Sequence, residues 1–147
     1  MSEHTVLLVE DSSSDEELTL RALRKSGIAN RVVVARDGAE ALDYLFARGK
    51  FAELEQLESP QVVLLDLNLP KVGGLEVLRQ IRANERTRLL PVVILTSSKE
   101  DQDLLSGYAS GANSYVVKPV DFSQFAEAVR QLGMYWLIVN QPAPTGA

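Results

Sequence analysis

Five short aliphatic runs, each followed by a stretch with helical character, place the strongest limit on how this chain of 147 residues can fold. The runs have the length of buried strands and are too short for core helices. They are Thr5–Glu10, Arg31–Ala35, Gln61–Leu65, Pro91–Leu95 and Ser114–Val117. Continuous apolar strands that alternate with helices are typical of a parallel sheet covered on both faces. We therefore predict an α/β fold, a doubly wound five-stranded parallel sheet with helices on both faces.

Capping residues mark several of the helices that connect these strands. A serine run beginning at Ser12 offers hydroxyl caps for the first helix, and Gly27 suits its C-terminal end. Asp37 and Asp121 are predicted to cap the second and fifth helices. The expected helices run from about Ser12 to Gly27, over Ala39–Ala47, from about Gly74, over about Glu100–Ala109, and from Asp121 to about Val139.

Two segments lie outside this regular alternation. The connection Lys50–Pro60 is longer than most, and Phe51, Leu54 and Leu57 recur in it every third residue, which predicts a short extra turn of helix. Residues 140–147 contain two prolines and a glycine and are expected to form a flexible tail. We therefore expect one domain, spanning residues 1–139.

Composition excludes several classes of function. A net charge of −5 and an isoelectric point near 4.9 do not provide the basic face that nucleic-acid binding requires. The chain has no cysteine, which excludes disulfides and thiolate metal sites. Its N-terminal apolar run is too short for a signal peptide or a membrane-spanning helix. We expect a cytoplasmic protein that binds neither nucleic acid nor membrane.

Charged side chains follow the ends of several predicted strands. Glu10 and Asp11 stand at the end of the first strand, Asp66 follows the third, and Lys118 follows the fifth. Because the carboxyl ends of parallel strands meet at one edge of the sheet, these side chains are expected to lie together. Carboxylates in a partly dry cleft repel one another and need a counter-charge. We predict an Mg²⁺ site made by Glu10, Asp11 and Asp66, with the backbone carbonyl of Asn68 as a further oxygen.

Two further side chains at this edge suit a phosphoryl group. Lys118 supplies a point charge for a phosphate oxygen, and Thr96, after the fourth strand, supplies a hydroxyl donor. Together with the acids they favour in-line phosphoryl transfer onto Asp66, a reaction in which positioning and charge neutralisation provide most of the catalysis.

Each of these residues also has an ordinary structural explanation. Asp66 alone could cap a helix or close a turn, and Glu10 and Asp11 could be solvated charges that favour the dipole of the first helix. Lys118 could be a surface lysine at a strand end, and Thr96 could cap the next helix. The common position of these residues at strand ends favours the functional interpretation.

The same residues resemble the conserved set of a response regulator receiver domain from two-component signalling. The match covers about residues 4–139 and consists of Glu10-Asp11, Asp66, Thr96 and Lys118-Pro119, in the order typical of the family. The resemblance implies the flavodoxin-like receiver fold, Asp66 as phosphoryl acceptor and a sensor histidine kinase as donor. It also implies Mg²⁺ on Glu10, Asp11, Asp66 and the Asn68 carbonyl, with the phosphoryl group bound by Thr96 and Lys118.

The resemblance further implies a switch pair and an unusual peptide bond. Thr96 and Tyr115 resemble the hydroxyl and aromatic residues that move on phosphorylation, although a plain packing role for Tyr115 stays open. The bond before Pro119 is expected to be cis. The sequence departs from the family at Ser97, where alanine is usual, and at Gly73, where aspartate or asparagine is usual.

Longer strings resemble the small regulators that pair with phytochrome histidine kinases. They are LVEDSSSDEEL, LLDLNLPKVGGLEVL, LTSSKEDQDLLSGYASGANSYVVKPVDFSQF and GMYWL. This narrower resemblance implies a phytochrome as the partner kinase. Only eight residues follow Val139, so we expect a stand-alone regulator that signals by protein–protein interaction. Its own catalysis would be limited to self-phosphorylation and slow autodephosphorylation.

Two other classes of protein also use a strand-end acid or a parallel sheet. Aspartyl-phosphate hydrolases place a second aspartate two residues after the nucleophile as acid and base, but here that position is Asn68. Nucleotide-binding proteins of the Rossmann type have a glycine-rich first turn, but here the turn from Glu10 to Asp15 is acidic and would repel a pyrophosphate.

The predicted C-terminal helix carries more apolar side chains than one buried face can hold. The inward stripe is expected to be Phe122, Phe125, Ala126, Val129, Leu132 and Trp136. The apolar residues left outside this stripe are Met134, Tyr135, Ile138 and Val139. Contiguous exposed apolar surface is typical of an interface. We predict a symmetric homodimer through this helix, together with the fourth helix and the fifth strand.

Overall fold

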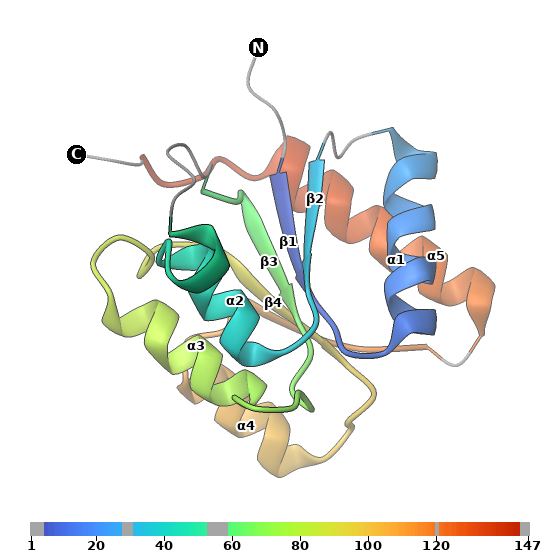
Figure 1. The fold of residues 1–147 in the computed structure, drawn as a ribbon. Helices are drawn as coiled ribbons and strands as arrows, with labels where there is room; N and C mark the ends of the chain where they lie inside the picture. Colours follow the sequence, from blue (N-terminus) through green and yellow to red (C-terminus); the bar gives the residue numbers. More distant parts are fainter. Residues whose placement is uncertain (1–4, 28–30, 53–58, 120, 145–147) are drawn as a thin grey trace.

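The computed structural model describes residues 5–27, 31–52, 59–119 and 121–144. Five parallel strands form one sheet in the order β2-β1-β3-β4-β5 (Figure 1). The strands are β1 Thr5–Val9, β2 Arg31–Ala35, β3 Val62–Leu65, β4 Val92–Thr96 and β5 Ser114–Val117. The predicted fold class is confirmed, and every strand boundary lies within about one residue of its predicted position.

Helices cover both faces of the sheet. The α-helices are α1 Ser13–Ser26, α2 Gly38–Leu45, α3 Gly74–Ala83, α4 Asp101–Ala109 and α5 Phe122–Gly133. Helices α1 and α5 lie side by side on one face, whereas α2, α3 and α4 lie on the other (Figure 1). Between each two strands that are consecutive in sequence the described residues include an α-helix, which is the layered arrangement that the sequence predicts.

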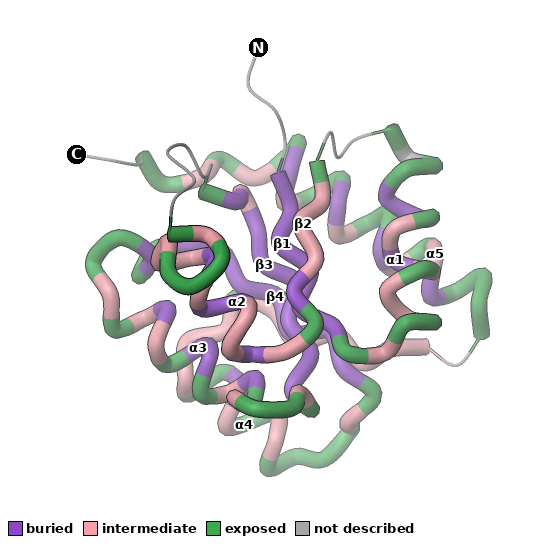
Figure 2. Tube along the Cα trace, in the orientation of Figure 1, coloured by how far each residue is buried: buried purple, intermediate pink, exposed green. Residues whose placement is uncertain are grey.

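Strand side chains alternate between two apolar cores. Leu7 and Ile94 belong to the core beneath α2 and α3, whereas Val6 and Leu64 belong to the core beneath α1 and α5. The central strands are buried along their whole length (Figure 2). Burying an aliphatic side chain of this size contributes roughly 1.5–3 kcal/mol, so the two cores fix the sheet and hold the ends of its strands in place.

The predicted helix caps are confirmed. The side chains of Ser12, Asp37 and Asp121 each accept a hydrogen bond from a backbone N–H in the first turn of the following helix. Gly27 follows α1 with a φ of 68°, a left-handed conformation that glycine adopts without a steric cost.

The end of the C-terminal helix differs from the prediction. After α5 the chain continues as a π-helix, η2, over Met134–Val139. Leu137 in η2 is buried, and Trp136, which was predicted on the inward stripe, is partly buried and packs against the same core. Phe122, the first residue of α5, was expected on the inward stripe but is 49% exposed.

The predicted extra turn after α2 is only partly described. A short 3₁₀ turn, η1, covers Gly49–Phe51, and the ring of Phe51 packs edge-on against Tyr44. Leu54 and Leu57, on which the prediction also rests, lie outside the described residues. Within the described part of the chain, no helix combines the length and apolar character needed to cross a membrane.

Candidate functional site

Three carboxylates meet at the carboxyl edge of the sheet, the lower edge in Figure 1. Ligand oxygens of Glu10, Asp11 and Asp66 all lie within 4.8 Å of one another. Glu10 and Asp66 are only 2% and 8% exposed, whereas Asp11 is exposed. Together with Lys118 and Asp15, described below, these residues are called the acidic edge. Burial of two carboxylates this close to a third requires a compensating positive charge.

The backbone ladder of the sheet delivers the two buried acids. The N–H of Glu10 donates to the carbonyl of Ala35 at 3.0 Å, which continues the pairing of β1 with β2. The N–H of Asp66 donates to the carbonyl of Val9 at 3.1 Å, which continues the pairing of β3 with β1. Strand pairing therefore brings two residues 56 positions apart in sequence to the same edge.

Lys118 supplies the compensating charge. Its Nζ donates to Glu10 Oε1 at 2.6 Å, to Asp15 Oδ2 at 2.8 Å and to Asp66 Oδ2 at 3.2 Å. The Lys118 side chain is 8% exposed, and its backbone N–H donates to the Thr96 carbonyl, which fixes the end of β5 against β4. All three donors of the ammonium group have carboxylate acceptors.

Burial favours the neutral form of the Glu10 carboxyl, and Lys118 favours its charged form. Burial raises the pKa of Glu10 from 4.5 to about 7, although the hydrogen bond and the charge of Lys118 act in the opposite direction. Burial disfavours the charged form of Lys118, but its hydrogen bonds to Asp15 and Glu10 outweigh this effect and raise the pKa of Lys118 above its ordinary value. The lysine therefore stays charged at neutral pH.

The loop after Asp66 is shaped by a glycine. A side chain at Gly74 would collide with the carbonyl oxygen of Asp66, so the start of α3 can approach the acid only with glycine at this position. Gly73 has open space around its Cα and an ordinary φ of −67°. The backbone at residue 73 therefore does not require glycine, although the family usually has aspartate or asparagine there.

The remaining predicted ligand lies in the same loop. The Asn68 N–H donates to Asp66 Oδ1 at 3.2 Å, and the Asn68 side chain is exposed. This bond holds one oxygen of the acid while Lys118 holds the other. The backbone of Asn68 thus lies close enough to help orient the Asp66 carboxylate.

Thr96 and Tyr115 are joined through Ser98. The buried Thr96 Oγ1 accepts a hydrogen bond from the Ser98 N–H at 3.4 Å, and the Tyr115 hydroxyl donates to the Ser98 carbonyl at 3.1 Å. The ring of Tyr115 lies against the α4 backbone at Gly107. Ser97, where the family usually has alanine, is exposed. The structure thus connects the two predicted switch residues by a bridge that the sequence does not reveal.

The predicted cis bond before Pro119 is wrong. The described residues contain no cis peptide bond, so the bond between Lys118 and Pro119 is trans. Trans is the more stable isomer of such a bond by about 0.5–1 kcal/mol. The trans backbone already allows Lys118 to reach all three carboxylates, so this contact provides no reason for the less stable isomer.

Sequence reasoning missed Asp15 as a member of the site. Asp15 lies in the first turn of α1, where an acid also favours the helix dipole, and it accepts a hydrogen bond from Lys118. One signal points to it: Asp15 follows Asp11 by four residues, and the first turn of α1 begins at the same edge of the sheet. Its partner is 103 residues away and could not be found from local spacing.

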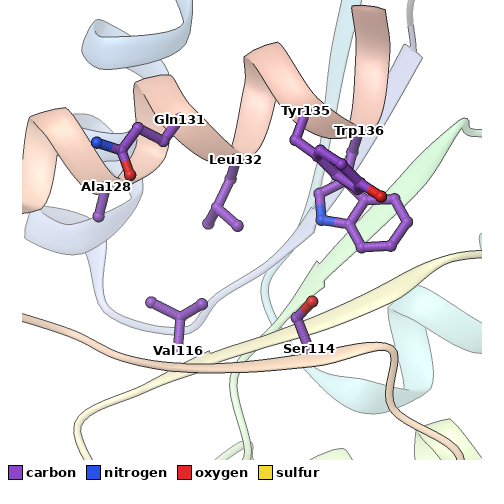
Figure 3. A pocket seen from close by; sticks show the side chains of 7 residues that line it. All are labelled: Ser114, Val116, Ala128, Gln131, Leu132, Tyr135 and Trp136. Atoms are coloured by element: carbon purple, nitrogen blue, oxygen red, sulfur yellow. The ribbon is translucent and has the colours of Figure 1, made fainter. Parts of the chain in front are cut away.

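A second surface is apolar and exposed. Met134, Tyr135, Ile138 and Val139 of η2 are 38–63% exposed and are called the C-terminal patch. Beside it, a groove of about 330 Å³ lies between α5 and β5. Figure 3 shows Tyr135 and Trp136 at one end of this groove, across from the β5 residue Ser114. Among the strands that the structure describes, β5 lies at the edge of the sheet and pairs only with β4.

The family model described as response regulator receiver domain matches residues 6–130, so the chain belongs to this family. FilR2 of Methanothrix harundinacea, a probable methanogenesis regulatory protein, is 44% identical over 95% of this chain and 88% of its own length.

Solved structures show the same relationship. RcpA, a cyanobacterial phytochrome response regulator in its phosphorylated form, superposes with a TM-score of 0.90 at 34% identity, over 97% of this chain and 100% of its own. The bacteriophytochrome response regulator RtBRR is 52% identical, with a TM-score of 0.76, over 97% and 86% of the two chains. Rcp1 of Synechocystis sp. has a Mn²⁺-bound structure with a TM-score of 0.88 and 33% identity, over 96% and 99%. The chain is therefore a response regulator receiver domain related to phytochrome-associated regulators.

Proposed function

We propose that Asp66 accepts a phosphoryl group from a sensor histidine kinase. The observation that carries this proposal is the position of Asp66, with Lys118 Nζ at 3.2 Å and the oxygens of two other acids within 4.8 Å. A carboxylate oxygen of Asp66 attacks phosphorus, the bond from phosphorus to the histidine nitrogen breaks, and the imidazole leaves. The chain's own catalysis is confined to this self-phosphorylation and to slow autodephosphorylation.

Mg²⁺ is the divalent ion that we propose for the three carboxylates. Hard oxygen ligands suit this ion, which characteristically binds one or two carboxylates together with waters and a phosphate. Glu10, Asp11, Asp66 and the backbone carbonyl of Asn68 would hold it. When bound, the ion neutralises charge that accumulates on the phosphoryl oxygens. The Mn²⁺-bound structure of Rcp1 supports a divalent ion in this family.

Lys118 and Thr96 are proposed to bind the phosphoryl oxygens, and Thr96 with Tyr115 to form the switch. Phosphorylation adds about −1.5 to −2 units of charge, which attracts a hydroxyl donor. If the Thr96 hydroxyl turns to the phosphoryl group, the hydrogen bond that it accepts from Ser98 is altered, and Ser98 also holds the Tyr115 hydroxyl. A change at the acidic edge therefore reaches the aromatic ring against α4.

A phytochrome is our proposed partner kinase. The support is the 52% identity to a bacteriophytochrome response regulator and the TM-score of 0.90 against a cyanobacterial phytochrome regulator. We propose that the protein works in the cytoplasm and signals through protein–protein contacts. Transfer rates from purified kinases test this directly: a phytochrome kinase should phosphorylate the chain at least ten times faster than an unrelated kinase. Equal rates would contradict the assignment.

A symmetric homodimer through the C-terminal patch is a further proposal. The patch offers projecting apolar side chains and lies beside a groove, so two copies related by a twofold axis could each offer both features. Helix α4 adds the exposed side chains Leu105 and Tyr108 on the neighbouring side of β5. Sedimentation at micromolar concentration should show a dimer, and a monomer both before and after phosphorylation would contradict the proposal.

The acceptor assignment is tested by labelling with acetyl phosphate. Wild-type protein should incorporate one phosphoryl group in an Mg²⁺-dependent reaction, in which acetate is the leaving group. Asp66→Asn should abolish labelling, because the amide cannot act as the nucleophile. Asp103→Asn, a change of the same kind in an acid bonded to Ser98 and outside the three-carboxylate group, is the matched control and should be labelled. Labelling of Asp66→Asn at another residue would overturn the assignment.

A further inference from the structure

Among the acids of the acidic edge, Asp15 differs from the others in what it contacts. Its Oδ2 accepts a hydrogen bond from Lys118 Nζ at 2.8 Å, which is shorter than the 3.2 Å between Lys118 and Asp66. The three carboxylates that could share a metal ion are Glu10, Asp11 and Asp66, and Asp15 is not among them. Asp15 therefore reaches the site through the lysine.

The cap of α1 explains why the Asp15 carboxylate is available. In a capping box, the acid three residues after the N-cap accepts a hydrogen bond from the backbone N–H of the cap. Here Glu10 Oε2 accepts that bond from the Ser12 N–H at 3.3 Å. The Asp15 N–H still donates to Ser12 Oγ at 3.3 Å, so only the other half of the box forms. The carboxylate of Asp15 is left to turn to Lys118.

The backbone of Asp15 is also held in place. The buried hydroxyl of Thr19 donates to the Asp15 carbonyl at 2.8 Å, one turn further along α1. Helix α1 packs against α5, and both cover the same face of the sheet. Asp15 is thus attached to a rigid element, which is the condition for a side chain to position another with precision.

The three acceptors of the Lys118 ammonium come from three directions. Glu10 stands at the end of β1, Asp66 at the end of β3, and Asp15 at the start of α1. An ammonium group has three N–H donors, so one acceptor from each element defines the position of Nζ completely. Of the three acids, Glu10 and Asp66 have proposed roles in the chemistry. Asp15 has none, although its bond to Lys118 is short and its side chain is only 33% exposed.

We propose that Asp15 is a positioning residue for Lys118. Together with Glu10 it holds the ammonium group beside the acceptor carboxylate, and it leaves the third N–H directed at Asp66 and at the phosphoryl oxygen that arrives there. The Lys118 ammonium then keeps its position when the bond to phosphorus forms, and only its third N–H changes its acceptor, which is the benefit of a preorganised charge. The inference rests on the proposed function of Asp66.

The test is the rate of phosphorylation by ³²P-labelled acetyl phosphate at saturating Mg²⁺. Asp15→Ala should slow the reaction about tenfold, the size expected from the loss of one charge-assisted hydrogen bond at a partly exposed position. Asp15→Asn keeps an oxygen that can accept the same bond and should recover most of the rate. In a Lys118→Ala background, Asp15→Ala should have no further effect, because its partner is already gone.

Glu16→Gln is the matched control. Glu16 also places a negative charge in the first turn of α1, but it pairs with Arg36 at 3.0 Å and does not contact Lys118. Its rate should equal that of the wild type. The inference is overturned if Asp15→Ala is as fast as wild type or faster, if Glu16→Gln is slowed equally, or if the effect of Asp15→Ala persists without Lys118. Failure of the wild type to be labelled would instead contradict the function proposed for Asp66.

Discussion

The acidic edge and the C-terminal patch are two surfaces of one domain that differ in whether their side chains already have partners. At the acidic edge, charges are buried and Lys118 already bonds to three acids. At the C-terminal patch, apolar side chains such as Ile138 and Val139 are more than half exposed, and a groove lies beside them. A phosphoryl group must therefore compete with existing contacts, whereas a second protein can dock on the patch without breaking any contact described here.

This difference indicates how the two surfaces should behave. Phosphorylation at the acidic edge changes hydrogen bonds made by Lys118 or Thr96, so it must alter the local structure. Association through the C-terminal patch removes apolar area from water and joins two molecules, so its extent depends on protein concentration. Variants that remove one side chain from each surface can separate these two kinds of behaviour.

Lys118→Ala should give the largest effect, because it leaves Glu10 and Asp66 buried beside each other without a counter-charge. The free energy of unfolding, measured by urea denaturation in metal-free buffer, should fall by about 3 kcal/mol. Saturating Mg²⁺ should restore part of the loss. The matched control is Lys50→Ala, which removes an exposed ion pair to Glu40 at 2.9 Å and should cost less than about 1 kcal/mol. Equal losses of unfolding free energy in the two variants would contradict the claim that the buried charge of Lys118 contributes more to stability than the exposed charge of Lys50.

Leu137→Ala and Ile138→Ala test the other surface with neighbouring residues. Leu137 is 3% exposed and Ile138 is 53% exposed. Leu137→Ala should lower the free energy of unfolding by about 2–4 kcal/mol, because it opens a cavity in the core. Ile138→Ala should leave this free energy within about 0.5 kcal/mol at monomer concentrations but weaken self-association about tenfold in sedimentation experiments. Unchanged association would show that the patch does not mediate the dimer.

The pH dependence of the free energy of unfolding should distinguish the acidic edge from the C-terminal patch, whose apolar side chains do not titrate in this range. The pKa of Glu10 is raised from 4.5 to about 7 in the folded state, so between these values the folded protein binds the proton more tightly than the unfolded chain. Stability contributed by protonated Glu10 is therefore present below pH 4.5 and is lost as the pH rises towards 7. In metal-free buffer the loss should be on the order of 3 kcal/mol, and Glu10→Gln should flatten the profile. A profile that keeps its slope in Glu10→Gln would assign the titration to another group.

Tyr115→Phe should have the smallest effect, because it removes only the hydrogen bond that joins Tyr115 to Ser98. The hydroxyl of Tyr115 donates to the Ser98 carbonyl at 3.1 Å in a half-buried position. Its loss should cost about 0.5–1 kcal/mol of unfolding free energy and should leave the initial rate of phosphorylation unchanged. Tyr108→Phe, at an exposed position of α4, is the control and should have no effect. A slowed rate in Tyr115→Phe would place this residue in the chemistry itself.

Much of the fold could be predicted from the sequence because its signals are local. Aliphatic runs specify strands, and hydroxyl or acidic caps specify where helices begin, as Ser12, Asp37 and Asp121 show. The carboxylates of the site were also predictable, because a buried parallel strand carries a charge only where it leaves the sheet. Glu10 and Asp66 illustrate this rule.

The features that escaped prediction depend on distant contacts or on small energy differences. The bond between Asp15 and Lys118 depends on how the start of α1 is oriented against β5, which no sequence spacing records. The π-helical end of the chain was not predicted, because its apolar residues fit a continuous α-helix equally well, and Leu137 is buried in the core that Trp136 also contacts. The isomer before Pro119 depends on about 1 kcal/mol and was assigned by resemblance alone.

The groove between α5 and β5 also gives the protein a built-in optical reporter. The chain has one tryptophan, and that residue, Trp136, lines the groove (Figure 3). All of the indole fluorescence therefore originates there, on the surface proposed to bind a second copy. Covering the groove would exclude water from the ring and shift its emission to shorter wavelength, so dilution alone should reveal assembly as a red shift without any label.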